Sequence, residues 1–288
     1  MTDYVLHNHL VEEYVRARPG DRVSVVRVRL VLRGRGRAET AARVLPRLSK
    51  RFLAAKLLEW AVVGTIAILP KLLRRGAVFR RLPRLARRLG LDYHETDDVM
   101  SSPTIAFLRE RATDVVVTLF HQIVRAELIA LPRLGVVNVH PGLLPAFRGI
   151  QPYLWELSEG AGRAGATLHR IDSEALDAGP VLGEASYATW PAISVQLNYY
   201  LSVRCAAALL PGCLAALHEG RVAPVAQDAS AGARWGWPDS AALDRLAARG
   251  HPVVSLRDLT GILVGRYDDF RAERSVLYDQ AAATTEAE

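Results

Sequence analysis

The chain has 288 residues, half of them hydrophobic, which is enough for one large core or two modest ones. Its formal net charge of +7 comes almost wholly from arginine, because there are only three lysines. The two cysteines, Cys205 and Cys213, lie in an apolar stretch and predict core packing in a reducing cytoplasm. This composition excludes a disulfide-stapled scaffold and a four-ligand zinc site, so we expect no metal.

The N-terminal part predicts a helix over residues 10–18, a strand over 22–32 and a loop over 33–39. Residues 4–6 form a meagre apolar start, so a complete first strand is nearly absent and Met1 need not be the natural start. Residues 51–75 predict a helix with an eleven-residue apolar run, from Trp60 to Pro70, whereas a bilayer span needs roughly 20 residues. We expect a buried or amphipathic helix, no integral membrane insertion and no signal peptide.

Residues 71–88 carry one lysine and seven arginines. Such a segment is either a solvated helix face or a surface that concentrates anionic ligands. It contains few aromatic residues, which argues against single-stranded nucleic acid as the ligand.

A helix is predicted over residues 104–111, then buried strands over 114–119 and 136–139, the second stopped by Pro141-Gly142. Asn138 and His140 therefore point the same way off a strand end, where open α/β sheets bind ligands. A carboxamide can donate to an oxyanion and an imidazole can move a proton, so the pair favours acyl-type chemistry. The alternative is a turn cap and a hydrogen-bonded loop histidine.

Two further polar elements follow, Gly165-Ala166-Thr167-Leu168-His169 and Leu176-Asp177-Ala178-Gly179-Pro180-Val181. The first polar element is the segment Asn138-Val139-His140-Pro141-Gly142-Leu143-Leu144-Pro145-Ala146-Phe147-Arg148-Gly149. Together the three elements resemble the catalytic core of the 10-formyltetrahydrofolate-dependent formyltransferases. This family includes the glycinamide ribonucleotide, methionyl-tRNA and sugar N-formyltransferases. The resemblance runs from Asp114 to Leu182. It implies an α/β, Rossmann-like formyltransferase fold with a mostly parallel sheet and a small C-terminal appendage.

The resemblance implies catalytic roles for Asn138, His140 and Asp177. In this chemistry an uncharged amine attacks the formyl carbon, and tetrahydrofolate leaves once its nitrogen is protonated. Asn138 would donate to the oxyanion of the tetrahedral centre. His140 would stabilise the same oxygen or pass a proton to the leaving nitrogen, and Asp177 would orient His140.

Binding residues are implied in the same way. The segment that follows the strand over 114–119 consists of Phe120, His121, Gln122, Ile123 and Val124. The resemblance implies that this segment binds the pterin ring of the cofactor, because family members hold the ring there with backbone groups. The alternative for Phe120 and Ile123 is plain core packing. Substrate binding is also predicted for three residues outside this segment. Arg148 would hold an anionic substrate group, with a structural salt bridge as the alternative. Thr167 and His169 would support the substrate site, with structural strand positions as the alternative.

The C-terminal part predicts a long helix over residues 194–220, a loop over 227–238 and a helix over 240–249. We predict a catalytic domain over residues 1–220, a small module over 221–280 and a disordered tail over 281–288. The module is smaller than the barrel with which methionyl-tRNA enzymes hold tRNA. The glycine-rich phosphate loop of the glycinamide ribonucleotide enzymes is also missing.

The expected protein is therefore a cytoplasmic N-formyltransferase that uses 10-formyltetrahydrofolate and a small-molecule amine, either an amino-sugar nucleotide or a specialised-metabolite amine. Three alternatives stay open: a formyltetrahydrofolate hydrolase, a methionyl-tRNA formyltransferase and a catalytically silent folate-binding protein. No nucleic-acid partner is expected, and a homodimer remains an alternative to a monomer.

Overall fold

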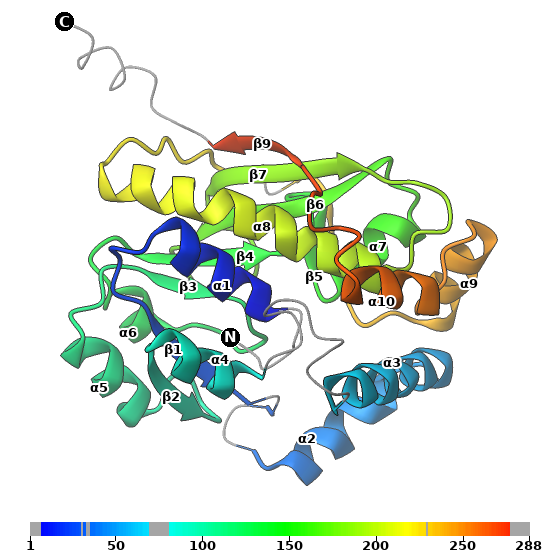
Figure 1. The fold of residues 1–288 in the computed structure, drawn as a ribbon, viewed down its shortest axis with the longest axis horizontal. Helices are drawn as coiled ribbons and strands as arrows, with labels where there is room; N and C mark the ends of the chain where they lie inside the picture. Colours follow the sequence, from blue (N-terminus) through cyan, green and yellow to red (C-terminus); the bar gives the residue numbers. More distant parts are fainter. Residues whose placement is uncertain (1–6, 30, 33–34, 69–80, 229, 277–288) are drawn as a thin grey trace, which may run out of the picture.

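A computed structural model describes residues 7–29, 31–32, 35–68, 81–228 and 230–276, and Figure 1 shows their α/β arrangement. Two strands, β1 (Ser24–Val28) and β2 (Asp92–Thr96), form a small parallel sheet. The larger sheet has the order β3-β4-β6-β7-β9. Its strands are β3 (Val116–Thr118), β4 (Val136–His140), β6 (Arg163–Ile171), β7 (Val181–Ala188) and β9 (Glu273–Val276).

The α/β, Rossmann-like expectation is confirmed, and the predicted parallel pairing occurs between β1 and β2 and between β3 and β4. On the other side of β4 the pairs β4–β6, β6–β7 and β7–β9 are antiparallel, which the sequence analysis does not anticipate. A third, parallel pair joins β5 (Phe147–Gly149) to β8 (Ala233–Trp235). The strand predicted over residues 22–32 is present as β1, and the meagre apolar start at residues 4–6 lies outside the described residues.

Ten α-helices and one 3-10 turn lie in the described part of the chain. Their bounds, in chain order, are α1 (Asn8–Ala17), α2 (Arg37–Val44), η2 (Leu45–Arg47), α3 (Lys50–Ile68), α4 (Leu82–Leu89), α5 (Ser102–Glu110), α6 (Ala126–Ile129), α7 (Pro152–Ser158), α8 (Val195–His218), α9 (Ser240–Ala248) and α10 (Leu256–Leu263). The helices predicted over residues 10–18, 104–111, 194–220 and 240–249 are thereby confirmed.

The main core lies between the larger sheet and α8. This helix packs on β6 and β7 and is covered in turn by α1 (Figure 1). Ser194 caps its first turn by accepting from the Leu197 amide, and the helix runs through Pro211 without ending. Cys205 and Cys213 lie on it as buried free thiols, which confirms their predicted core packing.

α8 is also the one helix in the described part of the chain that is long and apolar enough to cross a membrane. Its apolar window is 72% buried inside the protein. Packing within the protein therefore covers most of this apolar window.

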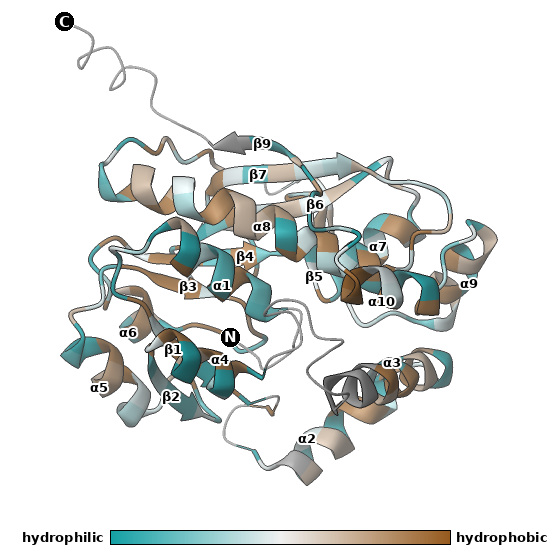
Figure 2. Ribbon diagram, in the orientation of Figure 1, coloured by the Kyte–Doolittle hydropathy of each residue, from teal (hydrophilic) through white to brown (hydrophobic). Residues whose placement is uncertain are grey.

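The helix predicted over residues 51–75 is described as far as Ile68 in α3. Phe52 at its start is buried, but Leu57, Leu58 and Trp60 are 53%, 56% and 52% exposed. As far as Val62, where burial is described, the helix therefore does not bury its large hydrophobic side chains as expected; the coloured part of α3 in Figure 2 includes hydrophobic residues. Most of the basic segment 71–88 falls on residues 69–80, outside the described residues.

The C-terminal elements join the sheets that carry the earlier strands. β9 extends the larger sheet beside β7, and β8 pairs with β5. Trp235 of β8 stacks on Trp155 of α7, with ring centroids 4.5 Å apart. The separate module over residues 221–280 remains a prediction, and these pairings show how closely its strands adjoin the rest of the chain.

Candidate active site

The site is built on the end of β4. Its valines, Val136, Val137 and Val139, are buried and fix the strand, while the register with β6 sets Asn138 opposite His169 and His140 opposite Thr167. Alternating side chains share a face, so these four polar residues meet on one side of the sheet. The predicted convergence of Asn138 and His140 is thus present, and β6 adds two partners to it.

Hydrogen bonds fix the Asn138 carboxamide in one orientation. Its Oδ1 accepts from the Thr118 hydroxyl at 2.7 Å, and its Nδ2 lies 2.9 Å from His169 Nε2. His169 Nδ1 lies 3.1 Å from the Arg170 carbonyl, which can only accept, so Nδ1 carries the proton and Nε2 accepts from Asn138. One Nδ2 hydrogen of Asn138 remains to donate to a ligand.

His140 is almost completely buried, and protein groups lie beside both of its ring nitrogens. Nε2 lies 2.7 Å from the Phe147 carbonyl, so it donates, and Nδ1 faces Asp177 Oδ1 at 3.5 Å. The loop that follows β4 therefore covers one side of the imidazole. Before Nε2 can give its proton to a substrate, its hydrogen bond to the Phe147 carbonyl has to break.

Asp177 lies on a turn and reaches back to both histidines. Its Oδ1 is 3.5 Å from His140 Nδ1 and 3.7 Å from His169 Nε2, and its Oδ2 accepts from the Gly149 amide at 2.9 Å. Burial alone raises the pKa of this carboxyl, but the charge of His140 and its hydrogen bond are the main opposing effects, and they hold the pKa well below its usual range. The carboxylate is therefore ionised at neutral pH beside His140.

The residues predicted to bind substrate all contact the protein itself. Thr167 donates from its hydroxyl to the Gly142 carbonyl at 2.9 Å and accepts from the Leu144 amide at 3.1 Å, which ties the loop after β4 to β6. Arg148 donates to the Asp228 carbonyl at 2.9 Å and to Gln227 Oε1 at 3.3 Å. Substrate contacts of these residues and of His169 remain predictions.

The segment predicted to hold the pterin, residues 120–124, leaves the sheet after β3. Its Gln122 donates to the Asp97 carbonyl at 2.6 Å and accepts from the Val99 amide at 2.9 Å, so it anchors the loop to the segment after β2. His121 Nε2 donates to the Val31 carbonyl at 3.0 Å, Val124 is buried, and Ile123 is 46% exposed. The backbone role in pterin binding remains a prediction.

Sequence reasoning missed two residues next to the site, Glu156 and Gln227. Glu156 in α7 is fully buried and accepts from the Leu143 amide at 3.0 Å and from Asn198 Nδ2 at 3.3 Å. Burial raises the pKa of its carboxyl well above the usual range. A lone carboxylate within the apolar heptapeptide of α7 is the signal that could have revealed Glu156.

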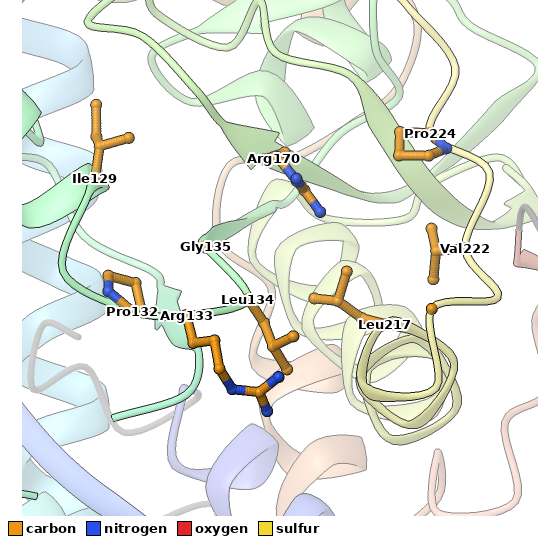
Figure 3. Close-up of a pocket in the computed structure, with 10 residues that line it drawn as sticks. Ile129, Pro132, Arg133, Leu134, Gly135, Arg170, Leu217, Val222 and Pro224 are labelled. Carbon is orange, nitrogen blue, oxygen red and sulfur yellow. The ribbon is translucent and has the colours of Figure 1, made fainter. Parts of the chain in front are cut away.

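A cavity of about 580 Å³, whose lining Figure 3 shows, is lined by none of these site residues. It is lined by Arg170 of β6, Leu217 of α8 and Gly135, which precedes β4, among others. Because His140 stands at the other end of β4, this cavity is not the predicted site. In the described ranges no three His, Cys, Asp or Glu side chains are grouped as a metal site would require.

Comparisons with known proteins bear on fold and family. Two solved structures share the fold. The first is a phosphoribosylglycinamide formyltransferase from Anaplasma phagocytophilum, at 14% identity and a TM-score of 0.54, with 81% of this chain and 92% of that chain covered. The second is a glycinamide ribonucleotide transformylase from Symbiobacterium toebii, at 19% identity and a TM-score of 0.51, with 79% of this chain and 92% of that chain covered. The fold is thus the Rossmann-like α/β fold of formyltransferases.

Sequence relatives narrow the class further. A profile described as formyl transferase matches residues 86–196. The methionyl-tRNA formyltransferase of Deinococcus radiodurans is 32% identical over 69% of this chain and 67% of its own length. That of Trichlorobacter lovleyi is 34% identical over 51% of this chain and 46% of its own length, so the match spans about half of that relative. The chain belongs to the formyl transferase family.

Proposed function

We propose that this protein transfers a formyl group from 10-formyltetrahydrofolate to the amine of a small molecule in the cytoplasm. The observation that carries the proposal is the ionised Asp177 carboxylate within 3.5 Å of His140 and 3.7 Å of His169, beside Asn138 at the end of β4. A donor for an oxyanion, a proton carrier and a fixed countercharge are what formyl transfer to an amine requires.

Each side chain has a task that its contacts support. The remaining Nδ2 hydrogen of Asn138 donates to the oxyanion that forms when the amine attacks the formyl carbon. His140 takes up and returns the proton that has to travel from the attacking amine to the leaving nitrogen. Asp177 balances the imidazolium that exists during this transfer, and its own pKa, lowered chiefly by His140, keeps it ionised.

The donor would supply the electrophilic formyl carbon, and the strand register supports where its pterin would bind. Thr118, the last residue of β3, pairs with Asn138, so residues 119–124 leave the sheet beside the strand end that carries Asn138. The partly exposed Ile123 and the backbone of this loop offer the apolar edge and the hydrogen-bonding groups that a pterin ring needs.

One second candidate has an observation in its favour. The relatives from Deinococcus radiodurans and Trichlorobacter lovleyi are both named methionyl-tRNA formyltransferase. The amine of methionyl-tRNA is therefore the alternative acceptor to the small-molecule amine. The two acceptors require the same chemistry at Asn138 and His140, so only an acceptor assay separates them.

The experiment measures tetrahydrofolate release from 10-formyltetrahydrofolate, first without amine and then with amino-sugar nucleotides, specialised-metabolite amines and methionyl-tRNA. We expect release that requires a small-molecule amine and disappears in His140→Ala. His218→Ala is the matched control, because this histidine is exposed at the end of α8. Release without amine would mean a hydrolase, release only with methionyl-tRNA would establish the second candidate, and folate binding without release would mean a silent protein.

A further inference from the structure

A segment beyond the family-matched stretch approaches the turn that carries Asp177. Val225 and Val181 form an antiparallel bridge in which each amide donates to the other's carbonyl, at 2.9 and 2.8 Å. In this antiparallel register the residue two positions after Val225 comes to lie opposite the residue two positions before Val181. Gln227 therefore faces Gly179, at the end of the Asp177 turn.

The Gln227 carboxamide is bonded on both of its ends. Its Nε2 donates to the Asp177 carbonyl at 3.0 Å and to the Gly179 carbonyl at 2.7 Å. Its Oε1 accepts from Nε and Nη2 of Arg148, both at 3.3 Å. One side chain thus connects the turn to β5, the strand that contains Arg148.

The turn needs such support because its backbone is strained. Asp177 has a φ of +52°, in the left-handed region that residues other than glycine rarely adopt. Backbone of this kind persists where surrounding groups impose it. The Gln227 amide holds the main chain of Asp177, while the Gly149 amide holds its carboxylate at 2.9 Å.

We propose that Gln227 is a positioning residue for formyl transfer, because its amide locks the turn that points the Asp177 carboxylate at His140 and His169. The inference rests on the proposed function and extends it to a residue outside residues 86–196, the part that matches the family profile. The segment around Gln227 then completes the geometry of a carboxylate that lies in the matched part.

Two substitutions separate the bonds of this amide. Gln227→Met keeps the length of the side chain and removes all of its hydrogen bonds. Gln227→Glu keeps the acceptor for Arg148 but removes the donor to the Asp177 and Gly179 carbonyls. Val225→Ala is the matched control, because Val225 uses its backbone in the bridge and its side chain is 53% exposed.

We expect both Gln227 variants to lower kcat roughly 10- to 100-fold, since a displacement of about 1 Å can cost that much, while KM for donor and amine changes little. Val225→Ala should match the wild type. A kcat that falls only in proportion to the folded fraction, followed by thermal unfolding, would overturn the proposal, as would Gln227→Glu with wild-type kcat.

A second measurement does not depend on activity. The carboxyl carbon of Asp177 is titrated by NMR in the wild type and the two variants. The charged or titratable groups that face Asp177 are His140 of β4 and His169 of β6, and Arg148 of β5 reaches its turn through Gln227. We expect the pKa of the Asp177 carboxyl to rise toward its usual value in both variants, because the carboxylate moves away from the histidines.

The two measurements fail in different ways. A wild type that transfers no formyl group would defeat the proposed function, and the titration would still decide the role of Gln227. An Asp177 carboxyl whose pKa is the same in the wild type and in both variants would show that other contacts hold the turn, and would overturn the inference.

Discussion

Asn138 illustrates how much of the chemistry is decided by the partners of a single side chain. Thr118 occupies its oxygen and His169 takes one amide hydrogen, so the carboxamide cannot rotate without losing both bonds. The second amide hydrogen is thereby aimed in one direction before any ligand arrives. Such preorganised donors stabilise a developing oxyanion far better than mobile ones do.

Removing this donor gives the first prediction. Asn138→Ala should lower kcat by about 10²- to 10³-fold, the usual cost of losing one oxyanion donor, with a much smaller effect on KM. Steady-state kinetics of tetrahydrofolate release measure it. Asn138→Asp is the companion variant, because a carboxylate still accepts from Thr118 but cannot donate. An Asp variant with wild-type kcat would contradict the role of donor.

At the scale of elements, α7 supports the loop after β4 through Glu156. All seven residues of this helix are buried, and the carboxyl of Glu156 holds the Leu143 amide and Asn198, which itself donates to the Tyr153 carbonyl at 2.8 Å. Tyr187 donates to Asn198 Oδ1 at 2.5 Å, so a polar chain crosses the core beneath the site. The loop that covers His140 thus depends on a buried carboxyl.

The raised pKa of Glu156 predicts how stability depends on pH. A carboxyl with a raised pKa in the folded state stabilises fully below its unfolded pKa of about 4.3, and that contribution is lost as pH rises toward the folded pKa. Glu156→Gln removes this loss. In urea unfolding, the free energy of unfolding of the variant should therefore rise relative to that of the wild type. The expected rise is up to about 1.4 kcal/mol for each pH unit above pH 4.3. Parallel pH profiles would contradict the prediction.

The pairing of β5 with β8 gives a third prediction. Gly149 has a φ of +105°, and an added Cβ would lie 2.2 Å from the Trp235 carbonyl oxygen. Gly149→Ala should therefore cost roughly 2 kcal/mol or more in the free energy of unfolding and lower kcat, because the Gly149 amide also holds Asp177. Gly162→Ala is the control, since a Cβ there meets nothing within 4 Å. Equal stability of the two variants, measured by urea unfolding, would refute the clash.

The elements also show what the sequence can predict. The valine run of β4 and its Pro-Gly stop predict both the strand and the side chains at its end, and the apolar length of α8 predicts a core helix. β9 is short and polar, so no local pattern marks it. Glu156 and Gln227 act across 42 and 50 residues of sequence, on Asn198 and Asp177. Spacing carries no information about contacts of that kind.

At the scale of the whole molecule, one hydrophobic cluster contains residues of the sheet, of α8 and of the C-terminal helices. Leu168 of β6, Leu201 of α8, Leu246 of α9 and Ile262 of α10 all belong to it. Elements that share a core unfold together, so we expect the described C-terminal helices to unfold cooperatively with the sheet.

The buried cysteines provide the measurement. Cys205 and Cys213 are fully buried, and burial raises the pKa of both thiols, that of Cys213 to about 12. An aromatic disulfide reagent should therefore label no thiol in the native protein and two thiols in denaturant, with rates that follow global unfolding. Rapid labelling of either cysteine under native conditions would mean that α8 opens locally.

The stacked pair of Trp155 and Trp235 has a practical consequence. The two indoles come from α7 and β8, face each other at 4.5 Å, and the Trp155 ring nitrogen donates to the Gly236 carbonyl at 3.2 Å. Indoles this close couple their electronic transitions, which produces a paired circular dichroism band that disappears when they separate. The circular dichroism of this tryptophan pair therefore shows whether β8 is paired with β5, and the measurement needs no label and no substrate.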